Sequence, residues 1–122
     1  MTPETLLYRQ IPDIHVQNGH ISSLAFTPMP KDLKKLSVYD GDLLSPAEAF
    51  EHFVEEIHCS SIGVLGVSNT ECSNLGLPTE SDPDTHKFHA LIDFSSESNN
   101  SVKRKASTLR DKAMLRGWLH KK

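Results

Sequence analysis

The chain has 122 residues, enough for one domain with a modest hydrophobic core. Its hydrophobic content of 37% and charged content of 24% are those of a globular protein, and no apolar run approaches the length of a membrane span. The formal net charge is −3, and the start of the chain lacks a signal-peptide pattern, so we expect neither membrane association nor export. The two cysteines, Cys59 and Cys72, form no Cys-x-x-Cys pair and predict free thiols in the cytoplasm.

Three strands are predicted in the first part of the chain. Leu6–Ile11 is apolar enough for a strand and is closed by Pro12, which lacks a backbone donor. Asn18-Gly19 predicts a tight turn, because both residue types tolerate positive φ. A second strand is expected over His20–Phe26 and a short third strand over Leu36–Tyr39.

The clearest helix is predicted from Ser45 to about Ile57. Ser45-Pro46-Ala47-Glu48 has the pattern of a capping box with proline at the first helical position. Apolar residues then recur at intervals of three and four, which gives the helix one apolar stripe: Ala49, Phe50, Phe53, Val54 and Ile57.

Further elements follow in the second half. Ser61–Ser68 is almost continuously apolar, which favours a central strand covered on both faces, and its two glycines permit close approach of another element. Asn69–Leu75 predicts one or two helical turns. Thr79–Thr85 is acidic and rich in turn residues, so we expect an exposed loop. Phe88–Phe94 predicts the last strand.

The C-terminal part combines a polar linker, residues 95–101, with a basic helix and tail, residues 102–122. The helix itself is expected over Val102–Arg116, ended by Gly117 as its cap and followed by Trp118, which is expected to dock on the core. Its inward residues are predicted to be Val102, Ala106, Leu109 and Ala113, with Leu115 or Met114 as a further one.

This order of elements predicts a single α+β domain over residues 1–122. Strands and helices interleave without a regular βαβ repeat, which favours a mixed or mostly antiparallel sheet of four to five strands. Two main helices, at about 45–57 and 102–116, are expected to cover one face of that sheet.

Polar residues on the predicted strands suggest a binding cleft. If the first three strands are neighbours, one face gathers an arginine, hydroxyl groups and an imidazole, and a cleft arginine matches a carboxylate or phosphate. The residues assigned to this cleft are Arg9, Ser22, Ser23, Tyr39, His20 and His89. A strand arginine followed by a serine-rich strand is similar to NAD-using ADP-ribosyltransferases, which also need a late catalytic acid. Only Asp93 or Glu97 is available for that role.

The seven histidines do not predict a metal site. His86 and His89 lie where a loop enters a strand, and their rings are expected to diverge because strand side chains alternate between faces. His15 and His20 are the other possible pair, and His52 is expected to be solvated. No nucleophile motif or dinucleotide fingerprint is present, and both cysteines are expected to be inert core thiols. No metal and no cofactor are therefore predicted.

The distribution of charge points to a partner. Residues 102–122 carry eight basic side chains and one acid, whereas residues 1–101 carry fifteen acids and five basic side chains. Such a helix is either solvated, folded against the acidic body, or presented to a protein or to nucleic acid. The residues assigned to partner contact are Lys103, Arg110, Arg116 and Trp118.

Several segments resemble a family of small uncharacterised bacterial proteins with no established activity. The segments are Tyr8-Arg9-Gln10-Ile11, Gly19 to Pro28, Lys31-Asp32, Leu36 to Gly41, His89 to Phe94, Leu109 to Ala113 and Arg116 to Leu119. The resemblance spans nearly the whole chain. It implies a stand-alone domain in the bacterial cytosol and an accessory role in a small operon, such as a defence or toxin-linked cassette.

Three functions are consistent with these patterns. The first is a non-catalytic accessory protein that binds a protein partner. The second is a nucleotide-binding or ADP-ribosyltransferase-like enzyme with a cleft at Arg9, Ser22 and Ser23. The third is a nucleic-acid binder that uses the basic C-terminal helix. The sequence favours the first and gives no signature of an enzyme.

Overall fold

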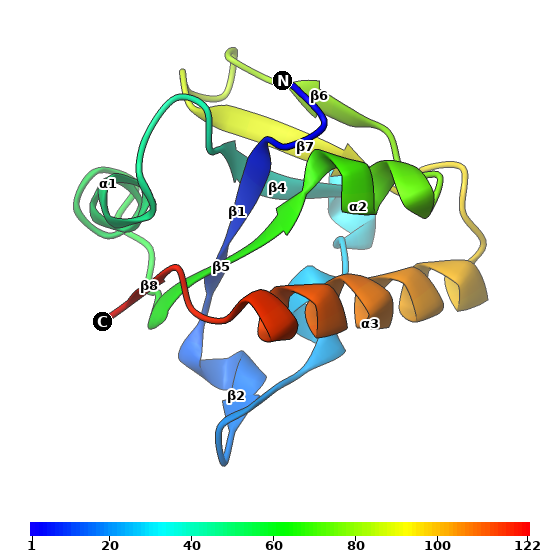
Figure 1. The fold of residues 1–122 in the computed structure, drawn as a ribbon, viewed down its shortest axis with the longest axis horizontal. Coiled ribbons are helices and arrows are strands. Elements are labelled where there is room, and N and C mark those ends of the chain that lie inside the picture. Colours follow the sequence, from blue (N-terminus) through cyan, green and yellow to red (C-terminus); the bar gives the residue numbers. More distant parts are fainter.

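The computed structural model describes all residues, 1–122, and is built around a six-stranded antiparallel sheet (Figure 1). Its strands are, in spatial order, β6 (Thr79–Ser81), β7 (His89–Asp93), β4 (Lys35–Asp40), β1 (Leu6–Ile11), β5 (Gly63–Ser68) and β8 (His120–Lys121). This confirms the predicted α+β class and the mostly antiparallel sheet. The sheet exceeds the expected four to five strands because short segments, β6 and β8, pair with its two outer strands.

The strand predicted over His20–Phe26 is wrong beyond its first two residues. Only β3 (His20–Ile21) is extended, and it pairs with β2 (Val16–Gln17) in a separate hairpin around the predicted Asn18-Gly19 turn. The chain then forms the 3₁₀ helix η2 (Ser23–Phe26). Ser22 Oγ accepts the Leu24 N–H at 3.1 Å, and this local capping bond competes with strand pairing.

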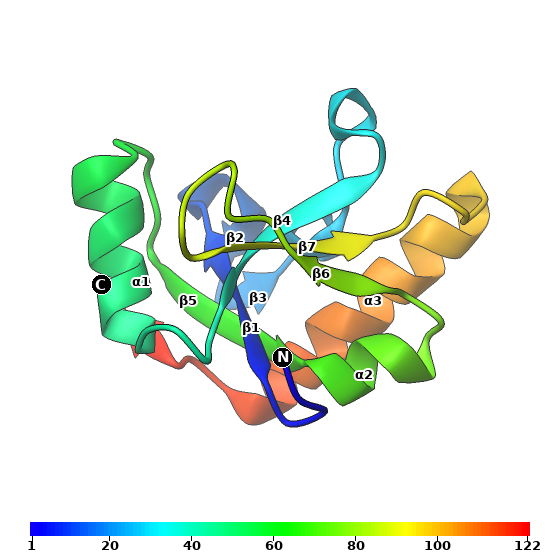
Figure 2. The same cartoon turned by 90° about the horizontal axis from the view of Figure 1, so that it is seen from above.

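Helices cover both faces of the sheet, not one face as predicted (Figure 2). The helix α1 (Pro46–Glu51) continues as the π-helical turn η4 (His52–Glu56) and packs on one face. The opposite face carries η2, α2 (Asn69–Asn74) and α3 (Asn99–Arg116). The reason lies in the strands, since β5 buries side chains on both faces and both must be shielded from water.

Most apolar side chains pack on the α3 face. Its core contains Leu7, Ile11, Phe26, Leu65, Ile92, Phe94 and Leu109 among its largest members. A smaller cluster on the α1 face contains Tyr8, Tyr39, Ala49 and Val64. The two remaining short helices, η1 (Asp13–His15) and η3 (Pro30–Asp32), lie outside both cores and contribute no buried residue.

The α3 helix begins at Asn99, three residues before the predicted start, so the last residues of the expected linker form its first turn. Ser98 Oγ caps it by accepting the Ser101 N–H at 3.2 Å. Val102, Ala106, Leu109 and Ala113 are buried as predicted, whereas Met114 and Leu115 are exposed because they lie on the outer side of the helix. Gly117 ends the helix at φ 87°. Trp118 packs against the core, as expected.

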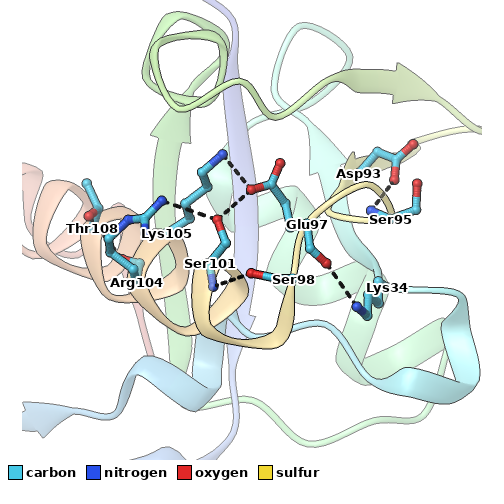
Figure 3. Close-up of polar contacts among 9 residues, drawn as sticks. All are labelled: Lys34, Asp93, Ser95, Glu97, Ser98, Ser101, Arg104, Lys105 and Thr108. Carbon is cyan, nitrogen blue, oxygen red and sulfur yellow. Dashed lines mark hydrogen bonds and ion pairs between the residues drawn. The ribbon is translucent and has the colours of Figure 1, made fainter.

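The basic helix folds back on the acidic body. Arg116 donates to the Gly66 carbonyl at 2.8 Å and to the Glu71 carboxylate at 2.9 Å. Lys105 Nζ lies 2.6 Å from Glu97 Oε1, a contact shown in Figure 3. The helix is thus a structural layer of the domain.

The structure contains no helix with the length and apolar character of a membrane span.

Candidate ligand-binding cleft

The cleft originates in a split between two central strands. β1 pairs with β5 over six residues, but it pairs with β4 only at Leu7–Asp40 and Tyr8–Tyr39. Beyond these two positions the strands lose their ladder. The floor of the cleft is consequently made of side chains from both strands: Tyr8, Arg9, Gln10, Ser37, Val38 and Tyr39.

The walls come from opposite sides of this split. Phe53 of η4 and the following Ile57 form one wall. Thr85 and His86, from the loop between β6 and β7, form the other wall together with His89 of β7. The volume of the cleft is about 220 Å³. That is below the roughly 300–1,000 Å³ of pockets for drug-sized ligands, so the cleft suits one small molecule.

Arg9 bridges the split. Its Nε donates to the Ala25 carbonyl at 2.7 Å and its Nη1 donates to the Ser37 carbonyl at 3.0 Å. The bond to Ser37 links β1 to β4 where their ladder is missing, and the bond to Ala25 ties β1 to η2. No carboxylate forms an ion pair with this guanidinium, and three of its five N–H donors have no partner in the protein. Burial lowers the pKa of Arg9 to about 10, with Asp32 acting in the opposite direction, so the group is charged at neutral pH.

Gln10 leaves a second polar group without a partner beside the cleft. Its side chain is only 5% exposed, and Nε2 donates to the Ala49 carbonyl of α1 at 3.1 Å. Its Oε1 is the one buried side-chain oxygen or nitrogen in the protein that has no hydrogen-bond partner. Such an orphan acceptor is costly unless a ligand or water supplies a donor.

Three histidine rings gather at the same place, which the sequence did not predict. The His86 ring centroid lies 4.7 Å from that of His52 and 5.1 Å from that of His89. The expected divergence of His86 and His89 is wrong because His86 precedes the strand, in a turn where the His89 N–H bonds to the His86 carbonyl at 3.0 Å. His52 is half-buried against Tyr39 and is not a solvated surface residue.

The hydrogen bonds indicate which nitrogen carries a proton in two of these rings. His86 Nδ1 accepts the Phe88 N–H at 3.2 Å, so in the neutral ring the proton is on Nε2. Burial, followed by the neighbouring His89 and His52, lowers the pKa of His86. His89 Nδ1 lies 2.9 Å from Asp82 Oδ2, which makes Nδ1 the donor. The hydrogen bond from Thr85 contributes most to lowering the pKa of Asp82; burial opposes it, and the hydrogen bond from His89 lowers the pKa further.

Tyr39 completes the cluster. Its hydroxyl lies 2.7 Å from His52 Nδ1, and its ring centroid lies 5.0 Å from that of His86. Burial, with a smaller effect of Cys59, raises the pKa of Tyr39. The phenol therefore stays protonated at neutral pH and shares a hydrogen bond with His52, whose tautomer sets which of the two groups donates. The cleft thus combines a cation, a phenol and a group of imidazoles whose charges depend on pH.

The structure brings together three of the six residues assigned to the cleft, namely Arg9, Tyr39 and His89. Ser22 and Ser23 do not line it, since Ser22 caps η2 and Ser23 belongs to that helix. His20 is exposed on the β2–β3 hairpin.

The two late acids also lie outside the cleft. Asp93 accepts the Ser95 N–H at 2.8 Å, and Glu97 is held by Lys105 and Ser101 in the network drawn in Figure 3. Both carboxylates thus bind groups at the start of α3 and the turn before it. Neither is available to the cleft in this arrangement.

The residues assigned to partner contact differ in their availability. Lys103 is exposed. Arg110 donates to the Ile21 carbonyl at 3.3 Å and to the Asp111 carboxylate at 2.9 Å. Arg116 is bound to the Gly66 carbonyl and to Glu71, and Trp118 packs on the core. Two of the three basic residues thus already hold the helix to the body.

Sequence reasoning missed His86, Gln10 and Phe53 as cleft residues. The spacing of His86 and His89 was a usable signal, because a turn of three residues brings both side chains to one side. No group of three or more His, Cys, Asp or Glu side chains is placed to hold a metal ion. Of the two free cysteines, Cys72 is buried, whereas Cys59 is exposed and is not the core thiol that was expected.

Comparison of the chain with protein-family models, with curated proteins and with solved structures finds no match.

Proposed function

We propose that the protein binds a small ligand of the nucleotide class, carrying a single negative charge, in the cleft between β1 and β4. The observation that carries the proposal is Arg9. A charged guanidinium that lines a cleft, has free N–H donors and faces no carboxylate partner is suited to a phosphate oxygen.

The rest of the lining supports an aromatic ligand. Tyr39 and Phe53 present rings to the cleft, and aromatic walls bind flat rings by offset stacking and by burial of apolar area. Gln10, in the cleft lining, has a carbonyl oxygen that lacks a donor, and an amino or hydroxyl group of a nucleoside would supply one. The volume of about 220 Å³ limits the ligand to one nucleoside unit.

The surroundings limit the charge of the ligand. Glu51, Glu55 and Glu56 line the neighbouring cavity, which also borders His52 and Phe88. These carboxylates oppose the approach of a polyanion. A phosphodiester carries one negative charge, whereas a phosphate monoester carries between one and two at neutral pH. A cyclic nucleotide therefore fits the single cation Arg9 better than a mononucleotide does.

The test is a titration by isothermal calorimetry with cyclic AMP, AMP and adenosine. We expect cyclic AMP to bind best, because it combines a ring with one charge. The variant Arg9→Met is expected to lose at least about tenfold in affinity, which corresponds to the loss of about 1.4 kcal/mol. Arg104→Met is the matched control, since Arg104 is exposed on α3 and bonds only to Ser101.

Arg9 also holds two carbonyls, so thermal unfolding must show that Arg9→Met is folded. Phe53→Ser provides a second variant that removes a wall without touching these bonds. Equal affinity of the Arg9 and Arg104 variants, or no binding of any of the three ligands to the unaltered protein, would contradict the proposal.

A second candidate function is contact with a protein partner through the outer side of α3, in the bacterial cytoplasm. It is supported by Leu115, which is 85% exposed, and by Lys112, one turn earlier and also exposed. Since Arg110 and Arg116 bind the body, charge reversal there would disturb the fold as well. The double variant Lys112→Glu with Leu115→Ser tests this surface cleanly. It should abolish capture of a stoichiometric protein from nuclease-treated lysate, and unchanged capture argues against this surface.

A further inference from the structure

We propose that the cleft takes up a proton together with its anionic ligand, so that its affinity rises as the pH falls, with the His52–His86–His89 cluster as the proton acceptor. The inference rests on the proposed function, because it concerns the same site. It adds a regulatory property that follows from the grouping of the rings and not from Arg9 alone.

The first step is the crowding of groups that become cationic. His86 lies within 4.7 Å of His52 and 5.1 Å of His89, measured between ring centroids, and shares the cleft lining with Arg9. Like charges this close repel one another strongly in a partly buried site. In the free protein this crowding disfavours the protonation of the central ring, His86. This agrees with the lowered pKa of His86, which burial causes first and the neighbouring His89 and His52 second.

The second step is the set of other charges around the rings. Asp82 of the β6–β7 loop accepts from His89, and Tyr39 of β4 bonds to His52. Glu55 and Glu56 of η4 border His52 from the outer cavity, and Arg9 lies on β1. Glu55 and Glu56 are absent from the cleft lining, whereas Asp32, with Lys31 and Lys35, lines a further cavity beside His89 and Asp82. The central ring, His86, thus has imidazoles on two sides and no carboxylate hydrogen-bonded to it.

The third step is what an anion changes. A phosphate bound at Arg9 places negative charge in the cleft that His86 and His89 line, and this charge favours their protonated forms. By linkage, a ligand that raises the pKa of these rings binds more tightly to the protonated protein. The affinity increases as the pH falls through the pKa of the rings in the complex and levels off below their pKa in the free protein. Uptake of one proton gives up to about a tenfold gain per pH unit within that window.

The experiment is calorimetric titration of the full chain with cyclic AMP between about pH 8 and pH 5.5, a range that spans the ordinary histidine pKa. The phosphodiester keeps one charge throughout, so any dependence on pH belongs to the protein. At one pH the titration is repeated in two buffers with different protonation enthalpies, which reports the number of protons taken up. We expect at least a tenfold rise in affinity towards acid pH and a net uptake of protons.

Two variants assign the effect to the cluster. His86→Gln removes the central ring and should flatten the rise in affinity, and His52→Gln serves if that variant does not fold. His20→Gln is the matched control, because His20 is exposed on the hairpin outside the cleft, and it should retain the full dependence on pH.

The outcomes separate the two proposals. Binding with constant affinity and no proton uptake overturns the inference and leaves ligand binding intact. An equal rise in the His86 and His20 variants overturns the assignment to the cluster. Absence of binding at every pH overturns the proposed function and this inference with it.

Discussion

At the scale of single residues, two glycines decide how the C-terminus docks. A Cβ added at Gly63 would lie 2.7 Å from the His120 carbonyl oxygen and 2.8 Å from the Trp118 ring. A Cβ added at Gly66 would meet mainly Leu119 Cδ1, at 2.6 Å. The first contact involves backbone and a rigid ring, whereas the second involves the flexible end of a side chain. The two positions, although both lie in β5, therefore differ in how well they tolerate replacement of the glycine by alanine.

The corresponding prediction is that Gly63→Ala destabilises the protein by about 1–3 kcal/mol, the usual cost of overpacking. Gly66→Ala should cost less, because Leu119 can change rotamer. Urea unfolding of both variants measures the difference. If Gly66→Ala proves the more costly of the two, β8 and Trp118 do not dock on β5 in the way described here.

At the scale of elements, α3 depends on its cap. Ser98 satisfies the Ser101 N–H, and Lys34 Nζ donates to the Glu97 carbonyl at 3.0 Å just before the helix (Figure 3). The helix has few apolar residues, and four of them are buried against the core. Because the apolar stripe of this helix is narrow, the groups that cap its ends contribute an important part of its stability.

We therefore expect Ser98→Ala to lower the free energy of unfolding by about 1 kcal/mol, since an N–H of the first turn loses its partner. Ser96→Ala is the control, because Ser96 is exposed and makes no hydrogen bond. Chemical denaturation of the two variants side by side gives the comparison. Equal stabilities would mean that another group caps the helix.

At the scale of the whole molecule, the opposite charges of the body and the tail are joined by specific ion pairs. Glu71 caps α2 through Ser68 and receives Arg116 at 2.9 Å, so α2, α3 and β5 meet at this carboxylate. Burial acts to raise the pKa of Glu71, but hydrogen bonds from Arg116 and Ser68 outweigh it, and the pKa is lowered overall.

Because the pKa of Glu71 is lower in the folded protein than in the unfolded chain, its carboxylate stabilises the fold at pH values above the unfolded pKa of about 4.3. This stabilisation is lost as the pH falls through the folded pKa. Glu71→Gln should therefore be less stable than the unaltered protein at pH 7, and the gap should narrow below about pH 4. Glu56→Gln, at an exposed site without such partners, should show no gap. Thermal unfolding at a series of pH values checks this, and a gap that widens in acid would contradict it.

The sequence by itself determined those features that depend on neighbouring residues. The capping box at Ser45, the turn at Asn18-Gly19 and the end of α3 at Gly117 each follow from backbone groups satisfied within a few residues. Apolar periodicity likewise gave the inward face of α3 and four strands of the main sheet. At Ser22-Ser23 the same local bonding misled the prediction, because hydroxyl capping won over strand pairing.

Only the tertiary structure decided the cleft. The split between β1 and β4 depends on a register that ends after two pairs, and no local pattern encodes that end. The meeting of His52 with His86 joins residues from a helix and a loop that packing alone brings within 4.7 Å. The direction of the basic helix was equally beyond the sequence, since folding back depends on where Glu71 and Glu97 lie in space. Contacts between distant segments are set by the balance of burial over the entire chain, which no local pattern specifies.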